Sequence, residues 1–175
     1  KEKMGVDNII KREHEIHKII YNRFLEMQNV HLLAENITDR LGVYSFYIQE
    51  CHYNLIVQLL NDRYGIQVRG GCSCAGTYGH ILLNVNEQKS TQITNAINKG
   101  DLSEKPGWVR LSIHPIMTDQ EINFIMDAIE QVSRNHDVWS QDYKYNQETN
   151  SFIFNKSDFQ GNKIRVKKWF KSNLI

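Results

Sequence analysis

Residues 41–65 read LGVYSFYIQECHYNLIVQLLNDRYG, and they contain two patterns that decide the fold. The stretch 41–48 is rich in β-branched and aromatic side chains, which predicts a strand. The stretch 52–64 places leucine and isoleucine on one side of a helix, and Gly65 is a typical helix end. A short strand that passes almost directly into a helix favours a protein that mixes both element types in one core.

The same reasoning extends outward in both directions. It predicts further helices over about 6–27, 84–98 and from Thr118, and further strands over about 30–34, 66–69, 108–113 and 152–154. The helix at Thr118 has a capping box, because Glu121 follows three residues later. Helices that alternate with short strands predict an α/β sandwich of two layers.

Length and composition narrow the class of protein. The chain has 175 residues, of which 41% are hydrophobic and 23% charged, so it has enough apolar material for a packed core. The length suggests one domain, and the composition shifts after about Asn135. A net charge of +1 argues against nucleic acid as a partner, and no apolar run approaches the roughly 20 residues that cross a bilayer. Three cysteines are too few for a disulfide scaffold, so we expect a cytoplasmic protein.

The segment Arg69–His80, RGGCSCAGTYGH, carries the most chemical information. Its four glycines predict a loop that can approach a ligand closely. Cys72 and Cys74 lie on this loop just after Arg69, and a neighbouring cation lowers the pKa of an exposed thiol, which indicates a reactive cysteine. The alternative is that these thiols are small buried hydrophobic groups, and that alternative is favoured for Cys51.

Other ligands for this segment are less well supported. Cys72, Cys74 and His80 have the spacing C-x-C-x5-H, but structural zinc usually requires a second ligand pair, and none is evident, so we expect no metal site. The spacings of phosphate-binding glycine loops are absent. A disulfide between Cys72 and Cys74 would be strained, because only one residue separates them.

Arg110 is the second candidate, because it lies in a strand whose neighbours Val109 and Leu111 are apolar. A buried arginine must find an anion, and its planar guanidinium matches a carboxylate. An ordinary ion pair or a position on a solvated face is equally compatible with the pattern.

The basic and aromatic segment Lys163–Lys171 allows two interpretations. It could contact nucleic acid or an acidic surface, but we favour docking of Val166, Trp169 and Phe170 on the body of the protein.

Two motifs resemble a known family. The first is YGIQVRGGCSCA at 64–75, and the second is VRLS at 109–112 followed by the T-x-x-E helix. In this order they resemble the C-terminal small domain of class V aminotransferases, pyridoxal-phosphate enzymes that include cysteine desulfurases and selenocysteine lyases. The resemblance covers about 4–132. It implies a small-domain unit over 1–134, with helices on a small, mostly antiparallel sheet, and a C-terminal extension over 135–175.

The resemblance also implies a role for each matching residue. Cys74 would be the catalytic nucleophile that attacks the sulfur or selenium of the substrate and carries a persulfide. Arg110 would bind the substrate α-carboxylate, with Arg69 as a second substrate-binding cation. Cys72 could relay sulfur.

The family's cofactor lysine, the pyridinium-pairing aspartate and the phosphate-binding residues belong to its large domain. We therefore expect a small-domain fragment with no cofactor-binding residues of its own, which is inactive alone because pyridoxal 5'-phosphate is bound by the large domain of the same protein. The favoured function is C–S or C–Se cleavage in an amino acid by a full-length enzyme that we expect to be a homodimer, with no nucleic-acid or membrane partner. The alternatives are amino-group transfer by a class V aminotransferase, and a non-catalytic thiol, zinc or interaction module.

Overall fold

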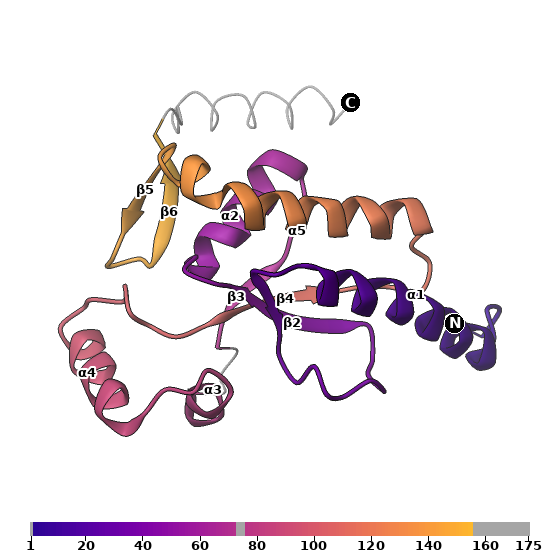
Figure 1. The fold of residues 1–175 in the computed structure, drawn as a ribbon, viewed down its shortest axis with the longest axis horizontal. Coiled ribbons are helices and arrows are strands. Elements are labelled where there is room, and N and C mark those ends of the chain that lie inside the picture. The colour runs from indigo at the N-terminus through magenta and orange to yellow at the C-terminus, as the bar shows by residue number, and fades with distance from the viewer. Residues whose placement is uncertain (1, 73–75, 156–175) are drawn as a thin grey trace, which may run out of the picture.

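The computed structural model of the chain describes residues 2–72 and 76–155 (Figure 1). The elements follow one another in the order α1 (Val6–Glu26), β1 (Val30–Leu32), β2 (Val43–Ile48), α2 (Tyr53–Tyr64), β3 (Arg69–Gly71), α3 (Gly76–Leu82), α4 (Glu87–Asn98), β4 (Trp108–Ser112), α5 (Asp119–Ser140), β5 (Tyr143–Asn146) and β6 (Ser151–Phe154). The predicted helices and strands appear in the predicted order, except that the strand predicted over 66–69 is shifted: residues 66–68 are not in a strand, and β3 begins at Arg69.

Four strands form the central sheet in the order β1-β2-β4-β3, and each neighbouring pair is antiparallel. Figure 1 shows α1, α2 and α5 on one side of this sheet and α3 and α4 on the other. Strands β5 and β6 form a separate antiparallel hairpin. The predicted fold class, helices layered on a small antiparallel sheet, is confirmed.

The core lies between the sheet and the helices α1, α2 and α5. Alternate residues of the two central strands, Phe46 in β2 and Val109 in β4, are fully buried there. They pack in one cluster with Ile20, Ile56 and Ile129 from the three helices. Because side chains alternate along a strand, the intervening residues lie on the opposite side of the sheet. We call that side the open face, and it carries Val43, Ser45, Arg69, Trp108, Arg110 and Ser112.

Local signals explain where two of these helices begin or end. The hydroxyl of Thr118 accepts the backbone N–H of Glu121 at 3.2 Å, and the Glu121 carboxylate accepts the backbone N–H of Thr118 at 2.8 Å, so the predicted capping box is confirmed. Helix α2 begins after His52, whose Nδ1 accepts the backbone N–H of Asn54 at 3.1 Å. It ends at Gly65, which adopts the left-handed conformation with a φ of 68°.

The glycine-rich segment differs from its prediction. We predicted a loop over Arg69–His80, but apart from Cys72 its described residues belong to the strand β3 and to the first five residues of helix α3. The strand pairs with β4, and Gly70 lets it lie close against α2, where a Cβ would be 2.9 Å from both Tyr53 and Val57. Glycine is therefore used here for close packing inside a regular element as well as for backbone freedom.

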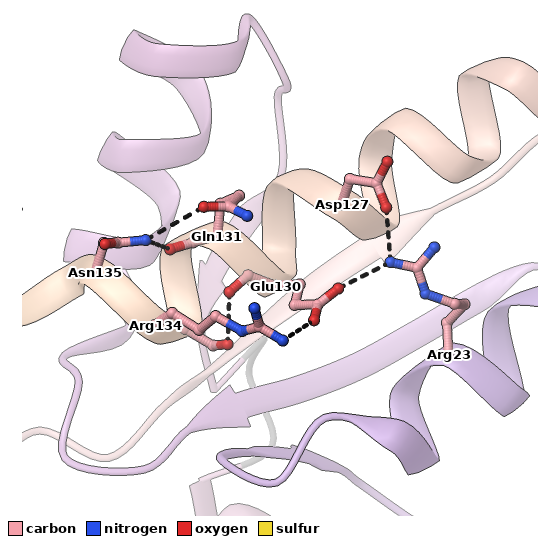
Figure 2. A network of polar contacts seen from close by, with 7 residues as sticks. Arg23, Asp127, Glu130, Gln131, Arg134 and Asn135 are labelled. Carbon is pink, nitrogen blue, oxygen red and sulfur yellow. Dashed lines mark hydrogen bonds and ion pairs between the residues drawn. The ribbon is translucent and has the colours of Figure 1, made fainter.

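An ionic network joins α1 to α5 (Figure 2). One guanidinium nitrogen of Arg23 lies 2.7 Å from Asp127 Oδ1 and 3.1 Å from Glu130 Oε2, and Glu130 also binds Arg134. The hydrogen bond with Asp127 raises the pKa of Arg23 above its usual value. Since most of these side chains are partly exposed, the network contributes modestly to stability and mainly fixes how α1 lies along α5.

Two further points concern the chain as a whole. None of the helices in residues 2–72 and 76–155 combines the length and apolar character that crossing a membrane requires. The predicted division between residues 134 and 135 falls inside α5, which runs without interruption to Ser140, and the division stays a prediction.

Truncation of the core at Ile129→Ala should lower the free energy of unfolding by about 2–5 kcal/mol, because it leaves a cavity between α5 and the sheet. Val138→Ala on the exposed side of the same helix should change it by less than about 0.5 kcal/mol. Urea unfolding of both variants measures the difference. Equal losses would contradict this assignment of the buried face.

The stability of the fold should depend on the charge of His52. Burial lowers the pKa of His52 below its ordinary value of 6.5. As the pH falls through that value, the unfolded chain gains a proton that the folded protein resists, so the free energy of unfolding falls. When urea unfolding is measured at about pH 7.5 and about pH 5.5, the free energy of unfolding should fall less between these pH values in His52→Asn than in the wild type. Asparagine keeps a capping side chain but removes the imidazole. His17, whose pKa burial also lowers, would account for part of the remaining loss. An unchanged loss in the variant would contradict this role of His52.

Candidate functional site

The pairing of β3 with β4 brings two arginines together on the open face. Arg69 lies directly opposite Arg110, and Ser45 of β2 lies opposite Arg110 on its other side. Arg69 is exposed and Arg110 is half-buried. The apolar neighbours of Arg110 in β4 point the other way into the core, so its guanidinium is not enclosed by the apolar residues that flank it in sequence.

Neither guanidinium is neutralised within the part of the chain that the structure describes. There, neither Arg69 nor Arg110 forms an ion pair or a side-chain hydrogen bond. Two like charges directly opposite one another on neighbouring strands destabilise a sheet. An anion bound between them would relieve that repulsion and could accept several hydrogen bonds. Of the alternatives for Arg110, an ordinary ion pair is therefore not found among the described residues.

A pocket of about 540 Å³ lies beside this arginine pair. It is lined by Val57, Gln58, Asn61, Gln67, Val68, Arg69, Arg110 and Ser112. Its amide side chains can donate and accept hydrogen bonds, and Asp62 holds the Gln58 amide at 2.9 Å. The combination of two cations with neutral polar groups suits a small carboxylate that also carries other polar groups.

Cys72 directly follows β3 and is a free, half-buried thiol beside Gly79 of α3. Cys74 lies outside the described residues, and so does the side chain of His80. The predicted reactivity of Cys74, its neighbourhood with Arg69 and the zinc alternative therefore all stay predictions. The described residues contain no group of three or more His, Cys, Asp or Glu side chains that could hold a metal ion.

Cys51 has the properties expected of a structural cysteine. Burial raises the pKa of its thiol to about 12, so it remains protonated at neutral pH. A protonated thiol is a poor nucleophile, which agrees with the interpretation of Cys51 as a small hydrophobic residue.

Tyr53 supports the site from the core side, although no local pattern in the sequence points to it. A Cβ on Gly70 would lie 2.9 Å from the Tyr53 ring, and a Cβ on Gly107 would lie 2.6 Å from it. The ring therefore fits only because both flanking positions are glycine. The sequence signal was present as Gly70 just inside β3 and Gly107 just before β4, but nothing local connected these glycines to a tyrosine at the start of α2.

A second, apolar pocket of about 360 Å³ lies on the open face next to the arginine pair. Leu33, Ile37, Val43, Tyr78, Leu82 and Trp108 are among its lining residues. Ile37, Val43 and Tyr78 are exposed. The open face thus has a cationic part and an apolar part, side by side.

Comparisons with known proteins agree with this architecture. The sequence profile of the family described as aminotransferase class-V matches residues 1–125. Among solved structures, the chain is similar to the apo cysteine desulfurase of Thermococcus onnurineus NA1, with 21% identity, a TM-score of 0.52 and coverage of 77% of this chain and 28% of that one. It is also similar to the cysteine desulfurase CsdA (S-sulfonic acid) of Escherichia coli, with 14% identity, a TM-score of 0.47 and coverage of 74% and 26%.

The chain spans just over a quarter of the length of each of these two enzymes. The similarity to the Thermococcus structure supports the fold of this chain. No relative is found among curated protein sequences.

Gly107→Ala should lower the free energy of unfolding by about 1–3 kcal/mol, because the new methyl group collides with the Tyr53 ring. The double variant with Tyr53→Leu should lose less than the sum of the two single variants, since a smaller side chain leaves room for the methyl. Denaturant unfolding of the double-mutant cycle measures this coupling. If the losses in the free energy of unfolding of the two single variants add up to that of the double variant, the Tyr53 ring does not restrict the side chain at position 107.

Proposed function

Because the chain belongs to the aminotransferase class-V family, we propose that it provides the carboxylate-binding part of the active site of a pyridoxal-phosphate enzyme that acts on an amino acid. Within that family, the function that we favour is cleavage of a C–S or C–Se bond. The observation that carries the proposal is the pair Arg69 and Arg110, which lie opposite one another on the open face and have no carboxylate partner among the described residues.

Arg110 is the better placed of the two to hold the substrate α-carboxylate. It is half-buried between Ser45 and Arg69, so its guanidinium is less hydrated than that of an exposed arginine and binds an anion more strongly. Arg69, exposed at the edge strand, adds a second positive charge to the same region. The adjoining amides of Gln58, Asn61 and Gln67 offer hydrogen bonds to the other polar groups of a small substrate.

Cys74 is the residue that we propose as the acceptor of sulfur. In this role its thiolate attacks the substrate sulfur, and an S–S bond forms as the C–S bond breaks. The bonding electron pair stays with the substrate carbon, which takes up a proton, and the enzyme carries a persulfide. Cys72 lies two residues earlier at the end of β3 and could pass that sulfur on.

The described residues do not by themselves fit the cofactor. Pyridoxal phosphate needs a lysine that forms a Schiff base, and no lysine lines the pocket beside the arginine pair. When bound, the cofactor supplies an electron sink for bond cleavage at the amino acid. We propose that the large domain of the same protein holds the cofactor and covers the open face, including its apolar pocket. Residues 1–175 alone would then be inactive, and the full protein would act as a cytoplasmic homodimer.

Amino-group transfer is the second candidate, since the matching family is described as aminotransferases. It uses the same carboxylate contact and does not require a thiol. The two reactions are therefore distinguished by Cys74 and not by Arg110.

The test uses the full protein that contains this chain, loaded with pyridoxal phosphate. With a thiol reductant present to cleave the persulfide, sulfide release from L-cysteine and selenide release from L-selenocysteine should be lost in Cys74→Ser. In Arg110→Lys, KM for the amino acid should rise by about 10- to 100-fold, because an ammonium cannot replace the two-pronged contact of a guanidinium. Arg12→Lys is the matched control, since Arg12 does not line the pocket and its guanidinium is paired with Asp119.

Three results have distinct meanings. Amino-group transfer that needs Arg110 but persists in Cys74→Ser would establish the second candidate. Activity of either kind with an unchanged KM in Arg110→Lys would contradict the proposed carboxylate site. Stoichiometric zinc lost on mutating Cys72 or Cys74, without either activity, would favour a thiol or zinc module.

A further inference from the structure

The hairpin β5–β6 lies outside residues 1–125, which match the family, yet it packs against the part of α2 that supports the site. Figure 1 shows the hairpin beside α2. Its strands pair in register from Tyr143 opposite Phe154 to Asn146 opposite Ser151. The turn that joins the strands includes Asn150, and this residue makes the contacts that matter here.

Asn150 links the hairpin to the first turn of α2 through two hydrogen bonds, and a third, from Tyr145 of β5, holds its side chain within the hairpin. Its side-chain Nδ2 donates to the Tyr53 hydroxyl at 2.6 Å, and its side-chain Oδ1 accepts from the Tyr145 hydroxyl at 3.0 Å. Its backbone oxygen accepts from Asn54 Nδ2 at 2.5 Å. Asn150 has a φ of 50°, a left-handed conformation that asparagine tolerates better than most residues. In this turn, both the Nδ2 and the Oδ1 atoms of the Asn150 side chain therefore form hydrogen bonds.

Tyr53 carries this contact to the site. Its hydroxyl is held by Asn150, and its ring lies against Gly70 of β3 and Gly107, the residue before β4. These two glycines are next to Arg69 and close to Arg110 along their strands. The position of the Tyr53 ring therefore affects where both arginine-bearing strands lie.

A second contact reaches the segment that leads into β4. The backbone N–H of Leu102 donates to the backbone oxygen of Gln147 in the hairpin turn at 3.2 Å. His52, the residue that caps α2, packs with the rings of Tyr145 and Phe152 at 5.4 and 5.3 Å. The hairpin therefore contacts both α2 and the segment around Leu102 that precedes β4.

We propose that the β5–β6 hairpin positions the arginine pair, with Asn150 as a positioning residue that acts through Tyr53. The proposal rests on the proposed function in one respect, since it takes the arginine pair to be the substrate site. The hairpin touches no substrate itself, and its effect is on the relative placement of β3 and β4.

The test again uses the full, cofactor-loaded protein. Tyr53→Phe removes the hydroxyl and leaves the ring against both glycines. Amide hydrogen exchange should accelerate in peptides that cover 66–72 and 101–110, and KM for the amino acid should rise by about 3- to 10-fold while kcat changes by less than about twofold. Asn150→Gly, which keeps the left-handed backbone and removes the amide, should reproduce both effects.

Tyr143→Phe is the matched control. The Tyr143 hydroxyl donates to Asp62 at 3.0 Å, so this variant also removes a hydrogen bond between the hairpin and α2, but at the opposite end of the helix. Asp62 keeps its contact with Gln58, a lining residue of the pocket. Amide hydrogen exchange in the peptides 66–72 and 101–110 should stay close to that of the wild type. KM for the amino acid should also stay close to the wild-type value.

Two outcomes overturn the proposal. The first is exchange that rises uniformly across the chain in Tyr53→Phe and Asn150→Gly, which would show a general loss of stability. The second is an equal response in Tyr143→Phe, which would show that any loosening of the hairpin suffices. Failure of the proposed function is seen separately, as an unchanged KM in Arg110→Lys. In that case the exchange pattern alone decides whether the hairpin positions the two strands.

Discussion

The antiparallel pairing of β3 with β4 is the constraint on which the candidate site depends. In this register Arg69 and Arg110 share the open face, and Gly70 and Val109 share the buried face. A slip of one residue would turn Arg69 toward α2 and Gly70 toward solvent. The register is fixed because only a glycine fits where Gly70 meets Tyr53 and Val57. The same packing that completes the core therefore places two positive charges side by side.

The two sides of the sheet differ in their side chains: one forms the apolar core, and the other is the open face. Helices α1, α2 and α5 fill one side with apolar side chains, and the Arg23 network fixes α1 against α5. This makes a firm support for the strands. The open face carries two cations that have no anionic partner among the described residues, and an apolar pocket that no described side chain fills. A face of this kind is expected where a further part of a protein and a small anionic ligand meet.

Local signals in the sequence predicted most of the fold. The β-branched and aromatic content of β2, the alternation in β4, the apolar stripe of α1 and the capping box at Thr118 each depend on residues close together in the chain. Arg110 was identified for a local reason as well, a charge in an apolar strand. Its side of the sheet followed only from the strand pairing, which no local pattern fixes.

The rest of the site depends on contacts between distant residues. Tyr53 and Asn150 are 97 positions apart, and neither has an unusual neighbourhood in the sequence. Glycines that indicated a loop are used inside β3 for close packing against α2. The strand β5, with its mixture of polar and aromatic residues, gave no clear period and was missed. Cys74, the residue on which the choice of reaction depends, lies outside the described residues.

The central claim is that the arginine pair binds the α-carboxylate of an amino acid. The most direct measurement is a crystal structure of the full, cofactor-loaded protein with L-alanine, which carries the carboxylate but no sulfur. The account predicts that the carboxylate lies within hydrogen-bond distance of the Arg110 guanidinium, on the open face and beside Arg69. A carboxylate bound by other residues, with Arg110 directed into solvent or paired with an acidic side chain of the protein, would contradict it.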